Sequence, residues 1–189
     1  MEKFSKDKDA CVKTLKAGGL ILYPTDTIWG IGCDATNEKA IERIYSLKKR
    51  SDKKTMIILV AKEEEIFNYS NYSGKKLFNY LEEAVKPTTV IYQYSKGLAK
   101  NLIAEDNTIA IRICKEQFCH ELIKEFGKPI VSTSANISGE KPPANFSAIS
   151  NEIKNGVDHI VSYRQEDRTA AVPSAVIRWE NEKPVIIRP

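Results

Sequence analysis

The chain has 189 residues, of which 42% are hydrophobic and 29% are charged, and its formal net charge is +4. This length suits one domain with a single core and argues against two well-packed ones. The mild positive charge is compatible with an anionic ligand such as a nucleotide, but it excludes the strongly basic tails of many nucleic-acid-binding proteins.

The four cysteines, at positions 11, 33, 114 and 119, have no regular spacing. Only two histidines accompany them, so no zinc-ligand pattern is present. We therefore expect reduced thiols, as in a cytoplasmic protein. The first residues lack the apolar centre of a signal peptide, and no apolar run is long enough to span a bilayer, so no membrane contact is expected.

Apolar residues at helical spacing alternate along the chain with short apolar or β-branched runs, a pattern that predicts one α/β domain over residues 1–189 with a mixed sheet. Ser5 and Asn37 are suited to capping the first two helices. Helices are expected from Ser5 to Gly18, from Asn37 to Leu47, within 62–80 around a loop at 71–74, and over 116–126. Strands are expected at 20–23, 56–60, 88–92, 108–113, 129–132 running into 133–136, 174–177 and 185–188.

The segment 30–35 reads Gly-Ile-Gly-Cys-Asp-Ala, which matches the dinucleotide-binding pattern GxGxxA. That pattern requires a strand that leads directly into the glycines and a helix that begins on them. Here six residues separate the predicted strand from Gly30, and the next helix begins only after Asn37. The sequence therefore argues against a Rossmann site, and no Walker A motif occurs either.

Two polar segments follow predicted strands, where open α/β sheets bind ligands. Thr25 and Asp26 belong to the first, although a turn bonded to its own backbone would explain them equally well. The second, 132–139, carries four hydroxyls and one amide before a glycine. Such a segment can bind phosphate oxygens through side-chain and backbone donors, and we favour this interpretation over a simple polar turn.

The run 48–54 contains five basic residues. Three interpretations stay open for it: a solvated helix end, a contact with nucleic-acid phosphates, or a clamp on the triphosphate of a nucleotide. Arg112 is also notable because the predicted strand places Ile109, Ile111 and Ile113 on one face and leaves Arg112 on the other.

Taken together, these segments resemble the YrdC-like threonylcarbamoyl-AMP synthase family. Residues 23–32 are similar to its Pro-Thr-(Asp/Glu)-Thr-x-(Tyr/Trp)-Gly-Leu-Gly opening, 48–50 to its KxR and 134–136 to its SxN. Arg112 falls at its RxP, 173–174 at its Pro-Ser-Thr, and Arg188 at an arginine near its C-terminus. The chain departs from the family pattern at Ser51, Thr55, Lys86, Cys114 and Ala175.

The resemblance implies a single-domain YrdC-like α/β fold, with a twisted mixed β-sheet flanked by helices. It also implies an enzyme that forms threonylcarbamoyl-AMP and pyrophosphate from L-threonine, bicarbonate and ATP, with Mg²⁺ accompanying the triphosphate. The reaction concentrates charge on phosphoryl oxygens, so such a catalyst mainly positions its substrates and neutralises their charge.

The resemblance further assigns roles to particular residues, and no metal ligand is among them. The catalytic set is Lys48, Arg50, Ser134 and Asn136. The ATP-binding set adds Thr133 and Arg188 to these four. The threonine-binding set is Thr25, Lys54, Arg112 and Ser174.

Two other functions are compatible with such a chain. YrdC-like paralogues include double-stranded RNA-binding or ribosome-associated factors, which would bind RNA without nucleotide turnover. Carbamoyl transfer in hydrogenase maturation uses a similar domain, but within longer chains with zinc-finger segments. For the synthase, the resemblance implies two kinds of partner. The first is tRNA or double-stranded RNA, and the second is a downstream complex that transfers the threonylcarbamoyl group to tRNA.

Overall fold

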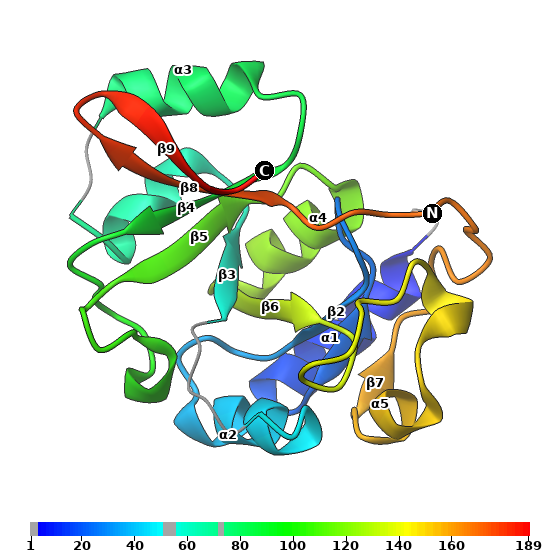
Figure 1. Cartoon of the computed structure of the whole chain (residues 1–189). Helices are drawn as coiled ribbons and strands as arrows, with labels where there is room; N and C mark the ends of the chain where they lie inside the picture. The colour runs from blue at the N-terminus through cyan, green and yellow to red at the C-terminus, as the bar shows by residue number, and fades with distance from the viewer. Residues whose placement is uncertain (1–3, 51–55, 72–73) are drawn as a thin grey trace.

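The computed structural model describes residues 4–50, 56–71 and 74–189. Helices and short 3₁₀ turns alternate with strands through these ranges (Figure 1). The helices are α1 (Ser5–Lys16), α2 (Glu38–Leu47), α3 (Lys75–Glu83), α4 (Gln117–Phe126) and α5 (Asn151–Asn155), with 3₁₀ turns η1 (Glu63–Asn68), η2 (Lys100–Leu102) and η3 (Phe146–Ala148).

The strands form one mixed sheet in the order β7-β1-β2-β6-β3-β5-β4-β8-β9. Segments from both ends of the chain thus meet in one sheet, which is the predicted α/β architecture. The strands are β1 (Ile21–Tyr23), β2 (Gly30–Gly32), β3 (Ile57–Val60), β4 (Thr88–Tyr92), β5 (Ile109–Ile113), β6 (Ile130–Ser134), β7 (His159–Ile160), β8 (Ala175–Glu180) and β9 (Lys183–Arg188).

Helix termini confirm one of the two predicted caps and correct the other. The side chain of Asn37 accepts a hydrogen bond from the Ala40 N–H, which satisfies one of the free donors at the start of α2. Gly127 ends α4 in the left-handed conformation, with φ 76°. The prediction for Ser5 was wrong: Ser5 is already helical, and Phe4, whose side chain makes no capping hydrogen bond, occupies the cap position.

The sheet has two chemically different faces in its central strands. On one face Ile58, Ile111 and Val90 lie side by side, as the register of β3, β5 and β4 requires. All three are at most 1% exposed, and they belong to the main core with the buried side of α4. Arg112 points to the opposite face, as its strand position predicted, and that face carries the polar residues described below.

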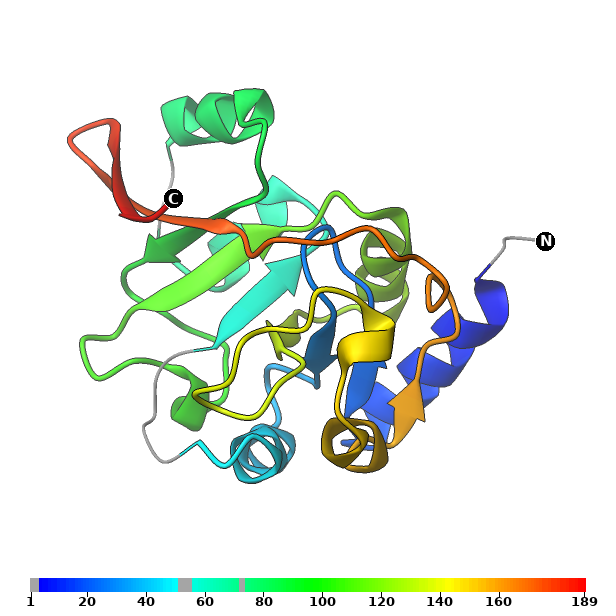
Figure 2. The ribbon, with the colours of Figure 1, turned by 45° about the vertical axis from the view of Figure 1, so that its right-hand side comes forward.

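A long connection, residues 162–174, joins β7 to β8 and runs across the loop that follows β1 (Figure 2). We call this segment the strap. Its backbone is tied to the loop after β6, because the Ala171 N–H donates to the Ala144 carbonyl at 3.2 Å. The strap thereby brings residues 173 and 174 to the polar face of the sheet. Among the described residues, no helix is long and apolar enough to cross a membrane.

Candidate active site

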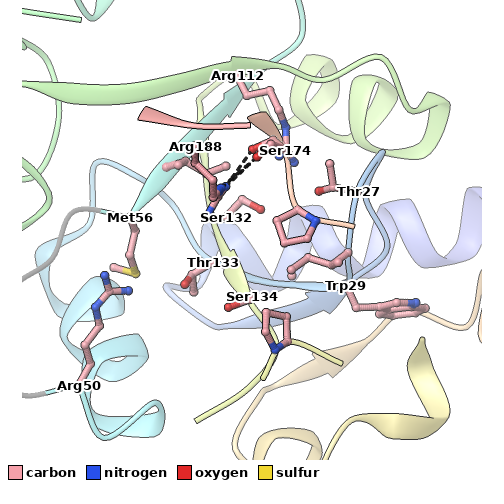
Figure 3. Close-up of a pocket in the computed structure, with 15 residues that line it drawn as sticks. Thr27, Trp29, Arg50, Met56, Arg112, Ser132, Thr133, Ser134, Ser174 and Arg188 are labelled. Atoms are coloured by element: carbon pink, nitrogen blue, oxygen red, sulfur yellow. Dashed lines mark hydrogen bonds between the residues drawn. The ribbon is translucent and has the colours of Figure 1, made fainter. Parts of the chain in front are cut away.

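A cavity of about 240 Å³ opens on the polar face of the central strands (Figure 3). In Figure 3 the side chains of Arg112, Arg188 and Ser174 gather near Ser132 of β6, whereas Arg50 lies apart from them, near Met56. The lining comes from β2, β3, β5, β6, β9, the loops after β1 and β6, the segment after α2 and the strap. The residues that line it are Thr27, Ile28, Trp29, Gly30, Arg50, Met56, Ile57, Arg112, Ser132, Thr133, Ser134, Pro142, Pro173, Ser174 and Arg188.

The two glycines of the GxG pattern are strand residues, so the rejection of a Rossmann loop is confirmed. Gly30 pairs with Ser134 across β2 and β6. A Cβ on Gly30 would lie 3.1 Å from the Ser132 hydroxyl, and one on Gly32 would lie 2.7 Å from a ring carbon of Tyr23. The glycines therefore let buried side chains approach the strand closely, and Gly30 leaves room beside the hydroxyl groups of β6.

Lys48 lies behind the polar end of β6 and does not line the cavity. Its ammonium group donates to the carbonyl oxygens of Ser134 at 2.5 Å and Asn136 at 2.6 Å, and the residue is 2% exposed. Burial, and then the nearby charge of Arg50, lower the Lys48 pKa to about 8. Lys48 thus fixes the backbone from which Ser134 faces the cavity.

Asn136 also shapes the loop that follows β6. Its side-chain amide donates to the carbonyls of Ile137 and Glu140, both at 2.9 Å, while its Oδ1 is buried without a hydrogen-bond partner in the described parts of the chain. The two ends of the SxN motif therefore differ in position. Ser134 is half-buried at the cavity, and Asn136 holds the turn behind it.

Arg112 reaches the cavity from β5 and forms a buried ion pair. Its Nη2 lies 3.0 Å from Oδ1 of Asp26, and the two side chains are 3% and 10% exposed. The pair has the distance but not the alignment of a hydrogen bond, since Asp26 Oδ1 and Arg112 Nε lack a hydrogen-bond partner among the described residues. Arg112 therefore keeps donor capacity that a ligand in the cavity would use.

Arg188 and Ser174 form the neighbouring part of the wall. The Arg188 guanidinium donates from Nε and Nη2 to the Ser174 carbonyl, at 3.1 Å and 2.9 Å (Figure 3). The Ser174 hydroxyl lies 2.9 Å from that of Thr89. Burial, and then repulsion from Arg112, lower the Arg188 pKa below its ordinary value. Two guanidinium groups are thus held close together in one cavity.

Thr25 is buried within the turn that follows β1 and does not line the cavity. Its hydroxyl donates to the Ile28 carbonyl at 2.8 Å and accepts from the Thr27 N–H at 3.0 Å. Of the two sequence interpretations of this segment, the backbone-bonded turn is the one found for Thr25. The turn nevertheless presents Thr27 to the cavity.

The structure brings together most of the residues predicted from the sequence, and it adds others. Lys54 lies outside the described residues. The sequence analysis did not select Thr27 and Ser132, although both belong to the motif segments. Trp29 also lies in the opening motif, and its ring packs at a tilt against that of Phe146, with 4.8 Å between the ring centroids. The predicted residues that line the cavity are Arg50, Arg112, Thr133, Ser134, Ser174 and Arg188.

The chemistry of the cavity is that of an anion site. Its described lining contains three arginines and five hydroxyl side chains but no carboxylate. Arginine and hydroxyl donors are suited to phosphate and carboxylate oxygens, and a cluster of like charges is stabilised when an anion binds among them. Within the described ranges there is no group of three or more His, Cys, Asp or Glu side chains that could hold a metal ion.

Comparison with known protein families gives one match over almost the whole chain. The Sua5/YciO/YrdC family model, described as "Telomere recombination", matches residues 13–189. A threonylcarbamoyl-AMP synthase of Idiomarina loihiensis is 32% identical over 168 residues, which cover 87% of this chain and 89% of the relative. One of Vibrio vulnificus is 33% identical over 132 residues, or 68% of this chain and 71% of the relative.

Solved structures show the same fold at lower identity. P. abyssi Sua5 complexed with L-threonine superposes with a TM-score of 0.83 at 23% identity, covering 97% of this chain and 54% of that one. The present chain thus spans about half of that protein. E. coli YciO superposes with a TM-score of 0.78 at 21% identity, covering 97% of this chain and 88% of that one.

Proposed function

The chain belongs to the Sua5/YciO/YrdC family and is an enzyme, which we propose acts as a threonylcarbamoyl-AMP synthase of the nucleotidyltransferase class. The reaction converts L-threonine, bicarbonate and ATP to threonylcarbamoyl-AMP and pyrophosphate, and its product serves threonylcarbamoyladenosine formation in tRNA. The observation that carries the proposal is a cavity lined by Arg50, Arg112 and Arg188 without a carboxylate in its described part. All the substrates of this reaction bring carboxylate, carbonate or phosphate oxygens to it.

In the proposed reaction, the threonine amine attacks the carbon of bicarbonate, and loss of water leaves a carbamate. A carbamate oxygen then attacks the α-phosphorus of ATP, and the bond to the β-phosphate oxygen breaks as pyrophosphate leaves. Charge builds on the α-phosphoryl oxygens during this step, so preorganised donors lower its barrier. The hydroxyls of Thr133 and Ser134 at the end of β6 are such donors.

The proposed roles follow the positions of the side chains. Arg50 lies at the cavity end formed by α2 and would bind the phosphates, while Lys48 would do so only if its ammonium left the two carbonyls it now contacts. Arg112, beside Ser174, would bind the threonine carboxylate, and Arg188 the nucleotide. Asn136 and Thr25 would act through the turns that they hold. Lys54 is retained as a threonine-binding candidate on the resemblance alone.

A Mg²⁺ ion would enter as part of the nucleotide. Mg²⁺ prefers oxygen ligands and usually keeps several waters. Because the described lining offers hydroxyls but no carboxylate, the triphosphate and water would supply most of its ligands. The ion would offset phosphate charge, while the arginines and hydroxyls orient the reactants.

We further propose the domain organisation of the enzyme, its cellular location and the fate of its product. We treat residues 1–189 as one YrdC-like domain, because the strands of its single sheet span residues 21–188. Its four buried cysteines are free thiols, in keeping with a cytoplasmic location. The product would pass to a threonylcarbamoyl transferase complex that modifies tRNA.

The test is pyrophosphate release from ATP by the purified protein, with L-threonine and bicarbonate omitted in turn. The proposal requires release only when both are present, and loss of release in Arg112→Ala. Release that ignores either co-substrate would contradict it. A folded protein that binds double-stranded RNA in a salt-dependent manner without any release would favour the RNA-binding paralogue instead.

A further inference from the structure

The turn after β1, residues 24–28, is held from outside the cavity by the strap. Arg164, in the strap, donates from Nη1 to the Thr25 carbonyl at 3.0 Å. The Cys119 thiol, from α4, donates to the Pro24 carbonyl at 3.1 Å. Two successive carbonyls of the turn are thus fixed by side chains from segments far away in the sequence.

Arg164 is itself held in one orientation. Its Nε and Nη2 donate to Oδ2 of Asp167 at 3.2 Å and 3.0 Å, which leaves Nη1 directed at Thr25. The other oxygen of Asp167 accepts from the Thr169 N–H at 2.9 Å. Hydrogen bonds from Thr169, and then the interactions with Arg164, lower the pKa of Asp167 to about 2, so its carboxylate is charged at neutral pH.

The backbone of Arg164 lies in the left-handed region, with φ 66°. For a residue with a side chain this conformation costs about 1 kcal/mol, and such costs are commonly found where the geometry serves a function. Glycine would adopt it without strain. The backbone conformation of the strap therefore does not favour an arginine at this position. The contacts of its guanidinium group are a reason for an arginine here.

The Thr25 carbonyl directly precedes Asp26, whose carboxylate pairs with Arg112 at 3.0 Å. Asp26 is one-tenth exposed, so the position of its side chain follows that of its backbone. A turn that shifted would move Asp26 and change where the Arg112 guanidinium points. Arg164 thus connects the strap to the cavity wall through one backbone carbonyl.

We propose that Arg164 is a positioning residue for the amino-acid end of the active site. Through the Thr25 carbonyl it fixes Asp26, and through Asp26 it orients Arg112 toward the carboxylate of the bound amino acid. This inference rests on the proposed function, in which Arg112 binds that carboxylate. Arg50 reaches the cavity from the segment that follows α2 and is not a member of this chain of contacts, so we expect the phosphates that Arg50 binds to be held independently of Arg164.

The test uses Arg164→Gly, which removes the guanidinium and relieves the backbone strain, so that a loss of function is separated from a loss of stability. The KM for L-threonine rises about tenfold, as expected for loss of a hydrogen bond to a charged group, while the KM for ATP stays within about twofold. Arg164→Lys restores part of the affinity, because its ammonium group can still donate to the Thr25 carbonyl. The matched control is Arg168→Ala, a strap residue with a 62% exposed side chain, which leaves both KM values unchanged.

An unchanged KM for L-threonine in folded Arg164→Gly would overturn the inference, as would an equal rise of both KM values. Should that variant fail to fold, Arg164→Asn, which also tolerates a positive φ, answers the same question. If the wild type shows no release dependent on L-threonine and bicarbonate, the proposed function fails. The inference is then tested by calorimetric binding of L-threonine: equal affinity of wild type and variant, or no binding to either, contradicts it.

Discussion

The ammonium group of Lys48 lies 2.5 Å from the carbonyl oxygen of Ser134, behind the strand end whose hydroxyl faces the cavity. The same carbonyl also accepts from the Asn136 N–H at 2.9 Å, so the buried cation adds a charged donor to a backbone turn that is already hydrogen-bonded. Lys48, the first residue of the KxR motif, therefore supports the backbone of the segment that we propose binds phosphate.

Replacing Lys48 by methionine is expected to lower the free energy of unfolding by about 2–4 kcal/mol, because the carbonyls of Ser134 and Asn136 lose a buried donor. The measurement is urea denaturation followed by circular dichroism. Lys49→Met is the matched control, because the Lys49 side chain is 64% exposed and its pair with Glu152 is a surface contact. Equal stability of both variants would show that the buried contacts contribute little.

The same residue predicts a pH dependence. The Lys48 pKa is lowered to about 8 in the folded protein, so between pH 8 and its ordinary value of 10.5 the unfolded chain binds more protons. The free energy of unfolding of the wild type should therefore rise with pH relative to that of Lys48→Met over this window. The difference between the two proteins is the correct measure, because burial also raises the pKa values of the Cys11 and Cys33 thiols and destabilises both proteins at high pH. A difference that stays flat from pH 7 to 10 would contradict the assigned cause.

The two strand glycines should respond differently to alanine. In Gly32→Ala the new Cβ would lie 2.7 Å from both a Tyr23 ring carbon and the Val131 carbonyl, which cannot move easily, so we expect a loss of about 2–3 kcal/mol. In Gly30→Ala its nearest neighbour is the Ser132 hydroxyl at 3.1 Å, so we expect a smaller loss of stability and a larger loss of activity. Thermal unfolding and pyrophosphate release measured on both variants test this order, and the reverse order would contradict it.

The turn between β8 and β9 has backbone strain that a glycine substitution should relieve. Asn181 and Glu182 have φ values of 48° and 62°, the pattern of a type I′ turn, in which the second residue is usually glycine. Glu182→Gly should raise stability by about 0.5–1 kcal/mol despite loss of the exposed pair with Lys76. Lys76→Ala measures what the pair contributes by itself. A destabilised Glu182→Gly beside an unaffected Lys76→Ala would argue against strain in the turn.

Removal of Arg188 should affect catalysis rather than folding. Arg188→Ala is expected to lower kcat/KM by about 100-fold, since it removes a charged donor from the cavity and a contact with the Ser174 carbonyl. Arg178→Ala, an exposed arginine on the neighbouring strand, should leave kcat/KM unchanged. Equal losses in the two variants would point to general electrostatics instead of a specific contact.

Sequence reasoning predicted the α/β class and most of the core strands, because the apolar runs of β1, β3 and β4 are short and clear. It missed β2, since two of the three residues in Gly-Ile-Gly are glycines, which are depleted in strands, and the segment pairs with β1 on one side and β6 on the other. It also missed β7, whose two residues carry no periodicity. Pairing with neighbouring strands, rather than local sequence, determines that β2 and β7 form strands.

The candidate site was predicted in part, for a similar reason. Arg50, Arg112 and Arg188 were identified because each is an arginine at a motif position of the family pattern. The burial of Lys48 behind Ser134 was not predictable, since a basic run gives no sign of which member turns inward. Arg164 was also missed, because it reaches the turn after β1 by a hydrogen bond to a residue 139 positions away in the sequence.

The proposed reaction is tested most directly by supplying ¹³C-labelled bicarbonate with ATP and L-threonine and analysing the products by mass spectrometry. We expect a labelled compound that contains both AMP and threonine, formed together with pyrophosphate and absent with Arg112→Ala. Turnover of ATP without labelled carbon in any nucleotide product would contradict the proposed reaction, even if pyrophosphate were released.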